Sequence, residues 1–183
     1  RMLDQVPDFV RASGKWQVKQ FKEEVEADLR TKGMGGFQLL QLHDFPGQGS
    51  ALVGVLDAFW DSKGYVDGET FRRFCSPTVP LARMEKLTWN SAETLVADIE
   101  ISHFGPEPLS DVTVTCQIID SDGEEIGNTK FGPRDIPIAN GTRLGRIEQS
   151  LEDFDAPGRY SLVVKIPGAE TSNEWGFWVY PGQ

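Results

Sequence analysis

Residues 35–49 read GGFQLLQLHDFPGQG, and this stretch decides the fold expected for the first part of the chain. Residues 37–43 read as a buried β-strand, and Gln41, His43 and Asp44 lie at its carboxyl end. The Pro-Gly pair after them is a turn signal. A buried strand with a polar carboxyl end is how a (β/α)₈ barrel presents the groups of its active site. The stretch therefore predicts one barrel strand that leads into a helix.

Helical patterns lie on both sides of this predicted strand. Three helices and one short helical turn are expected, over residues 3–12, 15–31, 50–62 and 68–74. The Ser13-Gly14 pair is expected to separate the first two, and Ser50 is placed to cap the third. A single strand among several helices cannot close a barrel. Residues 1–76 are therefore predicted to be a partial (β/α) barrel segment, the C-terminal remnant of a catalytic barrel.

The period of the apolar pattern changes to two near Pro77–Pro80. Seven short strands are predicted, over residues 84–89, 95–101, 112–118, 125–131, 143–150, 160–166 and 172–180. This spacing is typical of an immunoglobulin-like sandwich, and Tyr160 stands where such a sandwich has its tyrosine corner. The predicted class is α+β overall, with an all-β immunoglobulin-like sandwich over residues 77–183 following the barrel segment.

The charge of the chain excludes some classes of partner. The formal net charge is −10, which argues against nucleic acid and anionic membrane surfaces because their phosphates would be repelled. Residues 1–76 are nearly neutral, with 10 Lys/Arg and 11 Asp/Glu, so most of the negative charge lies in residues 77–183. No apolar run approaches the roughly 20 residues that span a bilayer. Cys116 is in phase with the apolar side of its strand and is expected to be a buried free thiol. No cofactor is expected.

The stretch from Gly35 to Gly49, followed by ALVGVLDAFWDSKG at residues 51–64, resembles the last βα unit of the catalytic barrel in bacterial β-galactosidase-like enzymes of glycoside hydrolase family 2. Residues 74–83, FCSPTVPLAR, are similar to the passage from that barrel into a C-terminal sandwich. Residues 173–181, NEWGFWVYP, resemble the final strand of that sandwich. The specific part of the resemblance is residues 33–83.

The resemblance implies a C-terminal portion of a retaining glycosidase that hydrolyses O-glycosyl bonds. A retaining mechanism needs two carboxyl groups, and both family glutamates would precede Arg1, so this chain alone is expected to be inactive. Gln41, His43, Asp44 and Gln48 would bind sugar hydroxyls on the wall of the substrate pocket. The expected partners are a carbohydrate, the remaining barrel and other domains of the parent enzyme, or a second copy of the chain. The resemblance implies a periplasmic or secreted location.

Each of these candidate features also has a purely structural interpretation. The four polar residues can be turn formers and helix caps, and Asn173-Glu174 is expected to be only a look-alike of a glycosidase acid/base motif. The acidic residues 120–125 favour a hairpin turn over a calcium site, and His103 has no neighbouring ligand, so no metal site is expected. The alternative function is a non-catalytic carbohydrate-binding or protein-interaction sandwich, which would use the exposed aromatic pair within residues 175–180.

Overall fold

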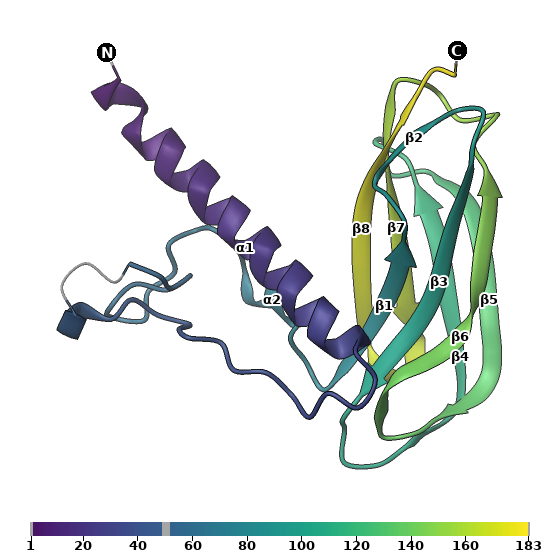
Figure 1. Ribbon diagram of the computed structural model, residues 1–183, viewed down its shortest axis with the longest axis horizontal. Helices are drawn as coiled ribbons and strands as arrows, with labels where there is room; N and C mark the ends of the chain where they lie inside the picture. Colours follow the sequence, from purple (N-terminus) through teal and green to yellow (C-terminus); the bar gives the residue numbers. More distant parts are fainter. Residues whose placement is uncertain (1, 49–51, 183) are drawn as a thin grey trace. The chain divides into compact units, whose positions relative to one another are not determined.

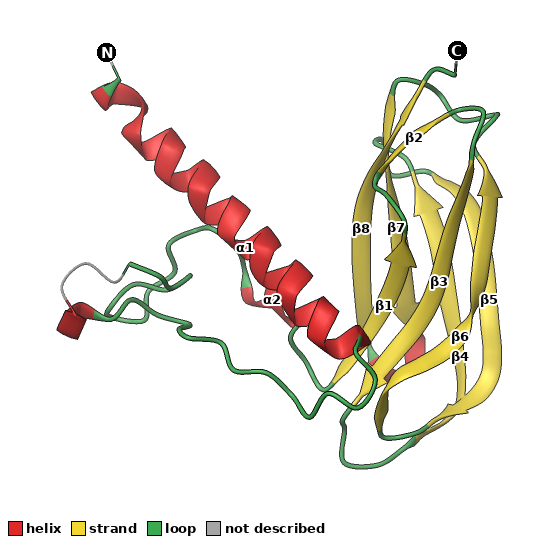
Figure 2. Cartoon of the chain, in the orientation of Figure 1, coloured by secondary structure: helices red, strands yellow, loops and turns green. Residues whose placement is uncertain are grey.

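A computed structural model of the chain describes residues 2–48 and 52–182 (Figure 1). It divides into two compact units. Unit 1 comprises residues 1–29 and 34–75, and unit 2 comprises residues 30–33 and 76–183. Unit 1 is helix and irregular backbone, whereas unit 2 is almost entirely β-structure (Figure 2). The expected α+β class is therefore wrong: the chain is mainly β, with one long N-terminal helix.

The long helix α1 spans Val6–Arg30 and follows the 3-10 turn η1, Leu3–Gln5. The expected break at Ser13-Gly14 is wrong, because α1 runs through both residues without interruption. A single glycine in place of alanine makes a helix less stable by only about 1 kcal/mol, which is not enough to end it. The buried side of α1 carries Val18, Val25 and Leu29. No helix in the described part of the chain is long and apolar enough to cross a membrane.

The expected barrel segment is also wrong. Residues 37–43 form no strand; the backbone is irregular, and only an isolated parallel bridge joins His43 to Leu56. A strand requires a neighbour that accepts its backbone hydrogen bonds along its length, and no strand of the described residues lies beside residues 37–42. These residues therefore form an irregular segment that belongs to no sheet.

The expected helix over residues 50–62 is not formed in its described part, residues 52–62. Its expected cap, Ser50, lies outside the described residues. Residues 55–63 instead form a tight reversal, with Leu56 bridged to Ser62 in antiparallel fashion. The short helix α2, Gly68–Arg72, confirms the expected helical turn, and Asp67 caps it by accepting a 2.6 Å hydrogen bond from the backbone N–H of Thr70.

Unit 2 is a sandwich of two sheets (Figure 1). One sheet has the strand order β1-β3-β6 and the other β2-β8-β7-β4-β5. The strands are β1 Thr78–Met84, β2 Thr88–Asn90, β3 Thr94–His103, β4 Leu109–Ile119, β5 Glu125–Ile136, β6 Ala139–Ser150, β7 Gly158–Ile166 and β8 Thr171–Tyr180. All pairings are antiparallel except that β2 runs parallel to β8. A 3-10 turn, η3 Pro167–Ala169, joins β7 to β8.

The core of the sandwich is built from the alternate residues that the sequence pattern marks as apolar. The innermost side chains come from β3, β4, β7 and β8 and include Leu95, Ile99, Val114, Leu162 and Phe177, all fully buried. The burial of these apolar side chains is the main stabilising contribution to the unit, at about 25 cal/mol per Å² of apolar surface removed from water.

Two features of the strand pattern differ from expectation. The strand expected over residues 84–89 is wrong, because β1 ends at Met84 and β2 begins at Thr88. The first strand was missed because its residues are buried on consecutive positions from Val79 to Ala82, so it shows no alternation. The sandwich consequently has eight strands among its described residues, not seven.

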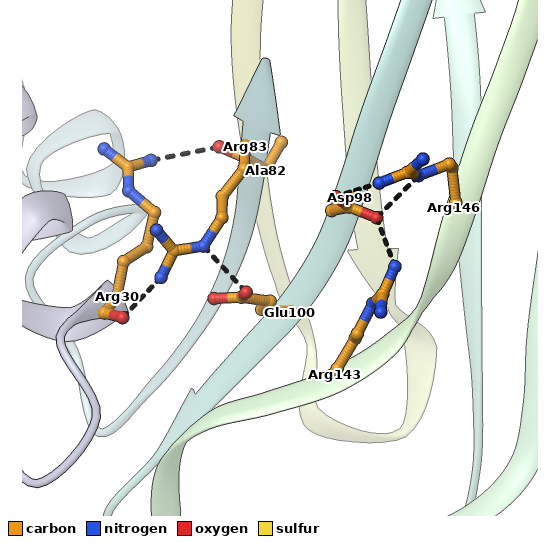
Figure 3. Close-up of polar contacts among 7 residues, drawn as sticks. All are labelled: Arg30, Ala82, Arg83, Asp98, Glu100, Arg143 and Arg146. Atoms are coloured by element: carbon orange, nitrogen blue, oxygen red, sulfur yellow. Dashed lines mark hydrogen bonds and ion pairs between the residues drawn. The ribbon is translucent and has the colours of Figure 1, made fainter. Parts of the chain in front are cut away.

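Residues 30–33 belong to unit 2 and are held there by side-chain hydrogen bonds. Arg30 donates to the backbone oxygen of Ala82 at 3.0 Å, and Arg83 donates to the backbone oxygen of Arg30 (Figure 3). The amide of Asn140 donates to the Thr31 oxygen at 2.6 Å and accepts from the Gly33 N–H at 3.2 Å. The turn after α1 is therefore part of the sandwich.

Candidate functional site

The predicted site residues lie in unit 1, where three short backbone segments are joined by hydrogen bonds. The Leu42 oxygen accepts from the N–H groups of Val55 and Leu56, each at 3.1 Å. The Asp44 N–H donates to the Leu56 oxygen at 3.0 Å, and the Lys63 N–H donates to the Val55 oxygen at 3.3 Å. These bonds bring residues 42–44, 55–56 and 62–63 together although they are far apart in the sequence.

Asp44 is the buried charged group at this junction, with only 5% of its surface exposed. Its Oδ1 accepts from the Lys63 ammonium at 2.6 Å and from the Gly54 N–H at 3.0 Å. Burial by itself would raise the pKa of Asp44, but the hydrogen bonds from Lys63 and Gly54 and the charge of Lys63 outweigh it, so the pKa lies below its usual value. Asp44 is therefore ionised at neutral pH and cannot act as a general acid.

A cavity of about 540 Å³ opens beside this ion pair, within unit 1. Helix α1 lines it with Phe9, Val10, Ser13, Gly14 and Gln17. The remaining lining residues come from the segment after the helix and are Asp44, Leu52, Lys63 and Tyr65. The lining is largely apolar with one ion pair, which is the composition of small-molecule sites, where few polar groups fix the orientation of the ligand.

A tight turn at residues 57–61 presents two large aromatic side chains to solvent. The Asp57 carboxylate holds the turn by accepting from the N–H groups of Phe59, at 2.8 Å, and Asp61, at 3.0 Å. Phe59 is 85% exposed and Trp60 is 60% exposed. Trp60 has a backbone φ of 72°, a conformation that bulky residues rarely adopt. Strain of this kind persists only where surrounding contacts impose it, and it is concentrated at functional sites.

The ring of Trp60 stacks on the ring of His43, with centroids 4.4 Å apart and planes at 21°. The stack joins the 57–61 turn to the segment that carries the predicted site residues. His43 is half-buried, so the indole is the exposed member of the pair.

The other two predicted site residues are Gln41 and Gln48. Gln41 is half-buried, and its Oε1 is enclosed without a hydrogen-bond partner in the part of the chain that the structure describes. Such an acceptor is suited to a ligand hydroxyl or a water molecule. The backbone of Gln48 lies in the 3-10 turn η2, Pro46–Gln48. The structure thus places His43 and Asp44 in specific contacts, while the Gln41 side-chain oxygen has no hydrogen-bond partner among the described residues.

Sequence reasoning gave no role to Trp60 or Lys63, which complete these contacts. Lys63 lies between polar residues and Gly64, so its local sequence gives no signal for its pairing with Asp44. Trp60 follows Asp57 by three residues, and an aspartate at the start of a short polar-flanked turn favours an Asx turn over a helix.

The features singled out in unit 2 have structural roles. Asp120 Oδ1 accepts from the N–H groups of Asp122 and Glu124, as a hairpin turn requires. Asn173 is buried and donates to the Pro80 oxygen at 3.0 Å. His103 is buried between the Thr78 hydroxyl and the Glu107 oxygen, each 2.8 Å from a ring nitrogen. Among the residues that the structure describes, no group of three His, Cys, Asp or Glu side chains is arranged to hold a metal ion.

A charged cluster lies on β3 and β6 (Figure 3). Arg146 donates to both oxygens of Asp98, at 2.9 and 2.8 Å, and Arg143 donates to Oδ1 at 2.7 Å. The hydrogen bonds from Arg146 and Arg143 hold the pKa of Asp98 far below its usual value. Because both carboxylate oxygens accept hydrogen bonds from arginines on the neighbouring strand, this cluster stabilises the pairing of β3 with β6.

Comparison with known proteins gives a family match for only part of the chain. A family model described as a domain of unknown function (DUF8488) matches residues 93–181, within unit 2. No curated protein matches the sequence. Among solved structures, a family 2 glycoside hydrolase with β-glucuronidase activity in its description is 15% identical, with a TM-score of 0.38 over 53% of this chain and 10% of its own. The β-glucuronidase of Parabacteroides merdae is 16% identical, with a TM-score of 0.40 over 56% of this chain and 14% of its own.

The similarity extends to proteins of other kinds. The CARDB domain of a Pyrococcus furiosus protein, described with bound metal ions, is 7% identical, with a TM-score of 0.42 over 57% of this chain and 94% of its own. This chain thus spans a small share of the β-glucuronidases and nearly the whole length of an unrelated β-domain. At these scores the likenesses decide neither a family nor a function.

Proposed function

We propose that this chain is the C-terminal portion of a retaining, β-galactosidase-like glycoside hydrolase. Unit 1 would contribute part of the wall that binds the carbohydrate, and the sandwich of unit 2 would be a structural accessory domain. The sequence support is the resemblance of the residue pattern in 33–83 to that family, although the strand over 37–43 and the helix over 52–62 that it implies are not formed. The structural support comes from the contacts of His43, Asp44, Trp60 and Lys63.

The observation that carries the proposal is the exposed indole of Trp60, stacked on His43 in a strained turn. A flat aromatic face that is held rigidly and left open to solvent is suited to stack on the apolar face of a sugar ring. Polar groups that can bind hydroxyls lie in the same unit, on Gln41, Asp44 and Lys63.

The proposal assigns no catalytic residue to this chain. Retaining hydrolysis requires two carboxyl groups about 5–5.5 Å apart, one of them protonated at working pH. Asp44 is held ionised by Lys63 and Gly54 and does not fit the acid role. We therefore expect no turnover of aryl β-galactosides by the chain alone, and turnover at an enzyme-like rate would contradict this assignment.

The proposal also accounts for apolar side chains that unit 1 leaves exposed. Val6, Phe9, Val10 and Trp16 on α1 are each at least 45% exposed, as is Phe59. Large exposed apolar patches on a soluble protein are normally contact surfaces. In the proposed parent enzyme they would pack against its other parts.

The test is saccharide binding measured by calorimetry and by ligand-observed NMR with methyl β-galactoside. Trp60→Ala should weaken binding by at least tenfold, because the stacking face is lost. Trp16→Ala is the matched control, since Trp16 is 61% exposed but lies outside the stack and the cavity lining. Equal affinity of the Trp60→Ala variant and the parent chain would remove the basis of the proposal.

A second candidate, a carbohydrate-binding sandwich, is favoured by a different observation. Trp178 and Tyr180 on β8 are 38% and 50% exposed, and the Arg159 guanidinium lies 5.8 Å from the centre of the Trp178 ring. These are the outward aromatic pair expected in the C-terminal strand. Loss of saccharide binding in Trp178→Ala, with Trp60→Ala unaffected, would favour this candidate.

A further inference from the structure

The cavity of unit 1 carries two charged side chains among its described lining residues, and these two are paired with each other. Asp44 and Lys63 both line the cavity, and the ammonium lies 2.6 Å from Asp44 Oδ1. The rest of the described lining is apolar or uncharged. The cavity therefore has a net charge of zero at neutral pH.

The pair nevertheless retains hydrogen-bonding capacity. An ammonium group has three donors, and Lys63 uses two of them, on Asp44 Oδ1 and on the Gly54 oxygen at 2.9 Å. Asp44 Oδ1 accepts from both the Lys63 ammonium and the Gly54 N–H, whereas Oδ2 accepts no hydrogen bond from the residues that the structure describes. Within the described part of the chain, one ammonium donor of Lys63 and the Oδ2 acceptor of Asp44 are thus unused. A sugar hydroxyl can use both kinds of group because it donates and accepts.

A sugar carboxylate would meet a different balance of forces. Its attraction to Lys63 would be opposed by repulsion from Asp44, whose charge lies only a few ångströms away in a half-enclosed site where charges are poorly screened. Its own desolvation would not be repaid by a free cation. The geometry consequently favours uncharged ligands over uronates.

We propose that Asp44 is a specificity-determining residue that neutralises Lys63 and so selects uncharged saccharides over uronic acids in this cavity. The inference rests on the proposed function, because it assumes that unit 1 binds a saccharide. The role proposed for Asp44 differs from the one expected from the sequence. Its main effect is on the charge of the cavity, through Lys63, and hydrogen bonding to a sugar hydroxyl is secondary. Loss of the Asp44 charge would leave Lys63 free to bind a carboxylate.

The experiment compares methyl β-galactoside with methyl β-glucuronide by calorimetry on the full chain at low salt. We expect the parent chain to bind the galactoside at least tenfold more tightly. Asp44→Asn should shift this ratio toward the glucuronide by at least tenfold. Asp67→Asn is the matched control, because it removes the same charge from unit 1 outside the cavity lining while asparagine preserves the cap of α2. Helix content by circular dichroism checks that each variant folds.

A second measurement keeps the inference testable if Asp44→Asn does not fold. Raising the salt from 20 to about 300 mM should leave the affinity of the parent chain for both sugars unchanged, because an uncharged cavity has no net field for salt to screen. Glucuronide binding equal to or tighter than galactoside binding, or glucuronide affinity that falls with salt, would overturn the inference and leave the proposed function standing. Binding of neither sugar would overturn both.

Discussion

The ring of Tyr65 occupies the space that a side chain at position 14 of α1 would need. A Cβ built on Gly14 would lie 2.4 Å from three atoms of that ring, closer than carbon atoms can approach. Both residues line the cavity of unit 1. The close approach of Tyr65 therefore explains why this position of the 25-residue helix is occupied by glycine.

Gly14→Ala should destabilise unit 1, although alanine is the better helix former. The gain in helix propensity is about 1 kcal/mol, whereas forcing a methyl group into a filled space costs typically 1–3 kcal/mol. Amide hydrogen exchange along α1 measures the outcome. Ser13→Ala is the control, because Ser13 is exposed and gains propensity without a clash. Slower exchange in Gly14→Ala than in the parent chain would show that Tyr65 moves away freely.

Tyr160→Phe should destabilise unit 2 by about 1–2 kcal/mol, because it removes a buried hydroxyl that donates to the Asp155 oxygen at 2.7 Å. This is the contact that a tyrosine corner makes. Urea unfolding followed by amide signals of β7 measures the change. Tyr180→Phe, which alters a half-exposed ring on β8, should have little effect. Equal stability of the parent and Tyr160→Phe would mean that the hydroxyl bond contributes nothing.

Unit 2 should lose stability in acid through Asp98. The hydrogen bonds from Arg146 and Arg143 lower the pKa of the folded-state carboxyl, so the folded state holds its proton less tightly than the unfolded state. The stabilisation is complete above the unfolded pKa of about 3.9 and is lost as the pH falls through the lower folded value. Unfolding midpoints of the parent chain and Asp98→Asn should differ most at pH 7. The difference should shrink below about pH 4; a constant difference down to pH 2 would contradict this linkage.

Cys116 should be inert to thiol reagents while unit 2 is folded. Burial raises its pKa to about 12, so the reactive thiolate is scarce, and only 2% of the residue is exposed. The rate of reaction with a disulfide reagent, measured on Cys75→Ser, isolates this thiol. We expect reaction in urea and almost none in native buffer. Rapid stoichiometric labelling in native buffer would show that the sheet opens at β4.

The sandwich could be predicted from sequence because one face of most strands is buried. Along β3, β4 and β8 the apolar residues recur at every second position, so Leu95, Cys116 and Phe177 are marked as core by pattern alone. β1 could not be found this way. Its residues from Val79 to Ala82 are buried at consecutive positions, and Pro80 within it reads as a turn signal.

Unit 1 shows where local pattern is insufficient. Residues 37–43 have the composition of a strand, but a strand depends on a partner that no local pattern specifies. Residues 52–62 contain apolar residues at helical spacing, yet Asp57 holds its own turn by two side-chain hydrogen bonds to the backbone.

The contacts of the candidate site also could not be predicted from the sequence. His43 and Asp44 are adjacent in the chain, but their partners, Trp60 and Lys63, are 17 and 19 residues away. Only the folded backbone shows which of the many possible partners each one meets.

The amide of Asn140 has a practical consequence for anyone who wishes to produce the β-sandwich alone. The chain enters this unit at Arg30, leaves it after Gly33 and returns at Ser76. An expression fragment that starts at Ser76 would delete both hydrogen-bond partners of a side chain that is 91% hidden from solvent, and would leave Arg83 without the Arg30 oxygen. A fragment that preserves these contacts would have to include residues 30–33, for instance by circular permutation, with these four residues joined to the other end of the sandwich sequence.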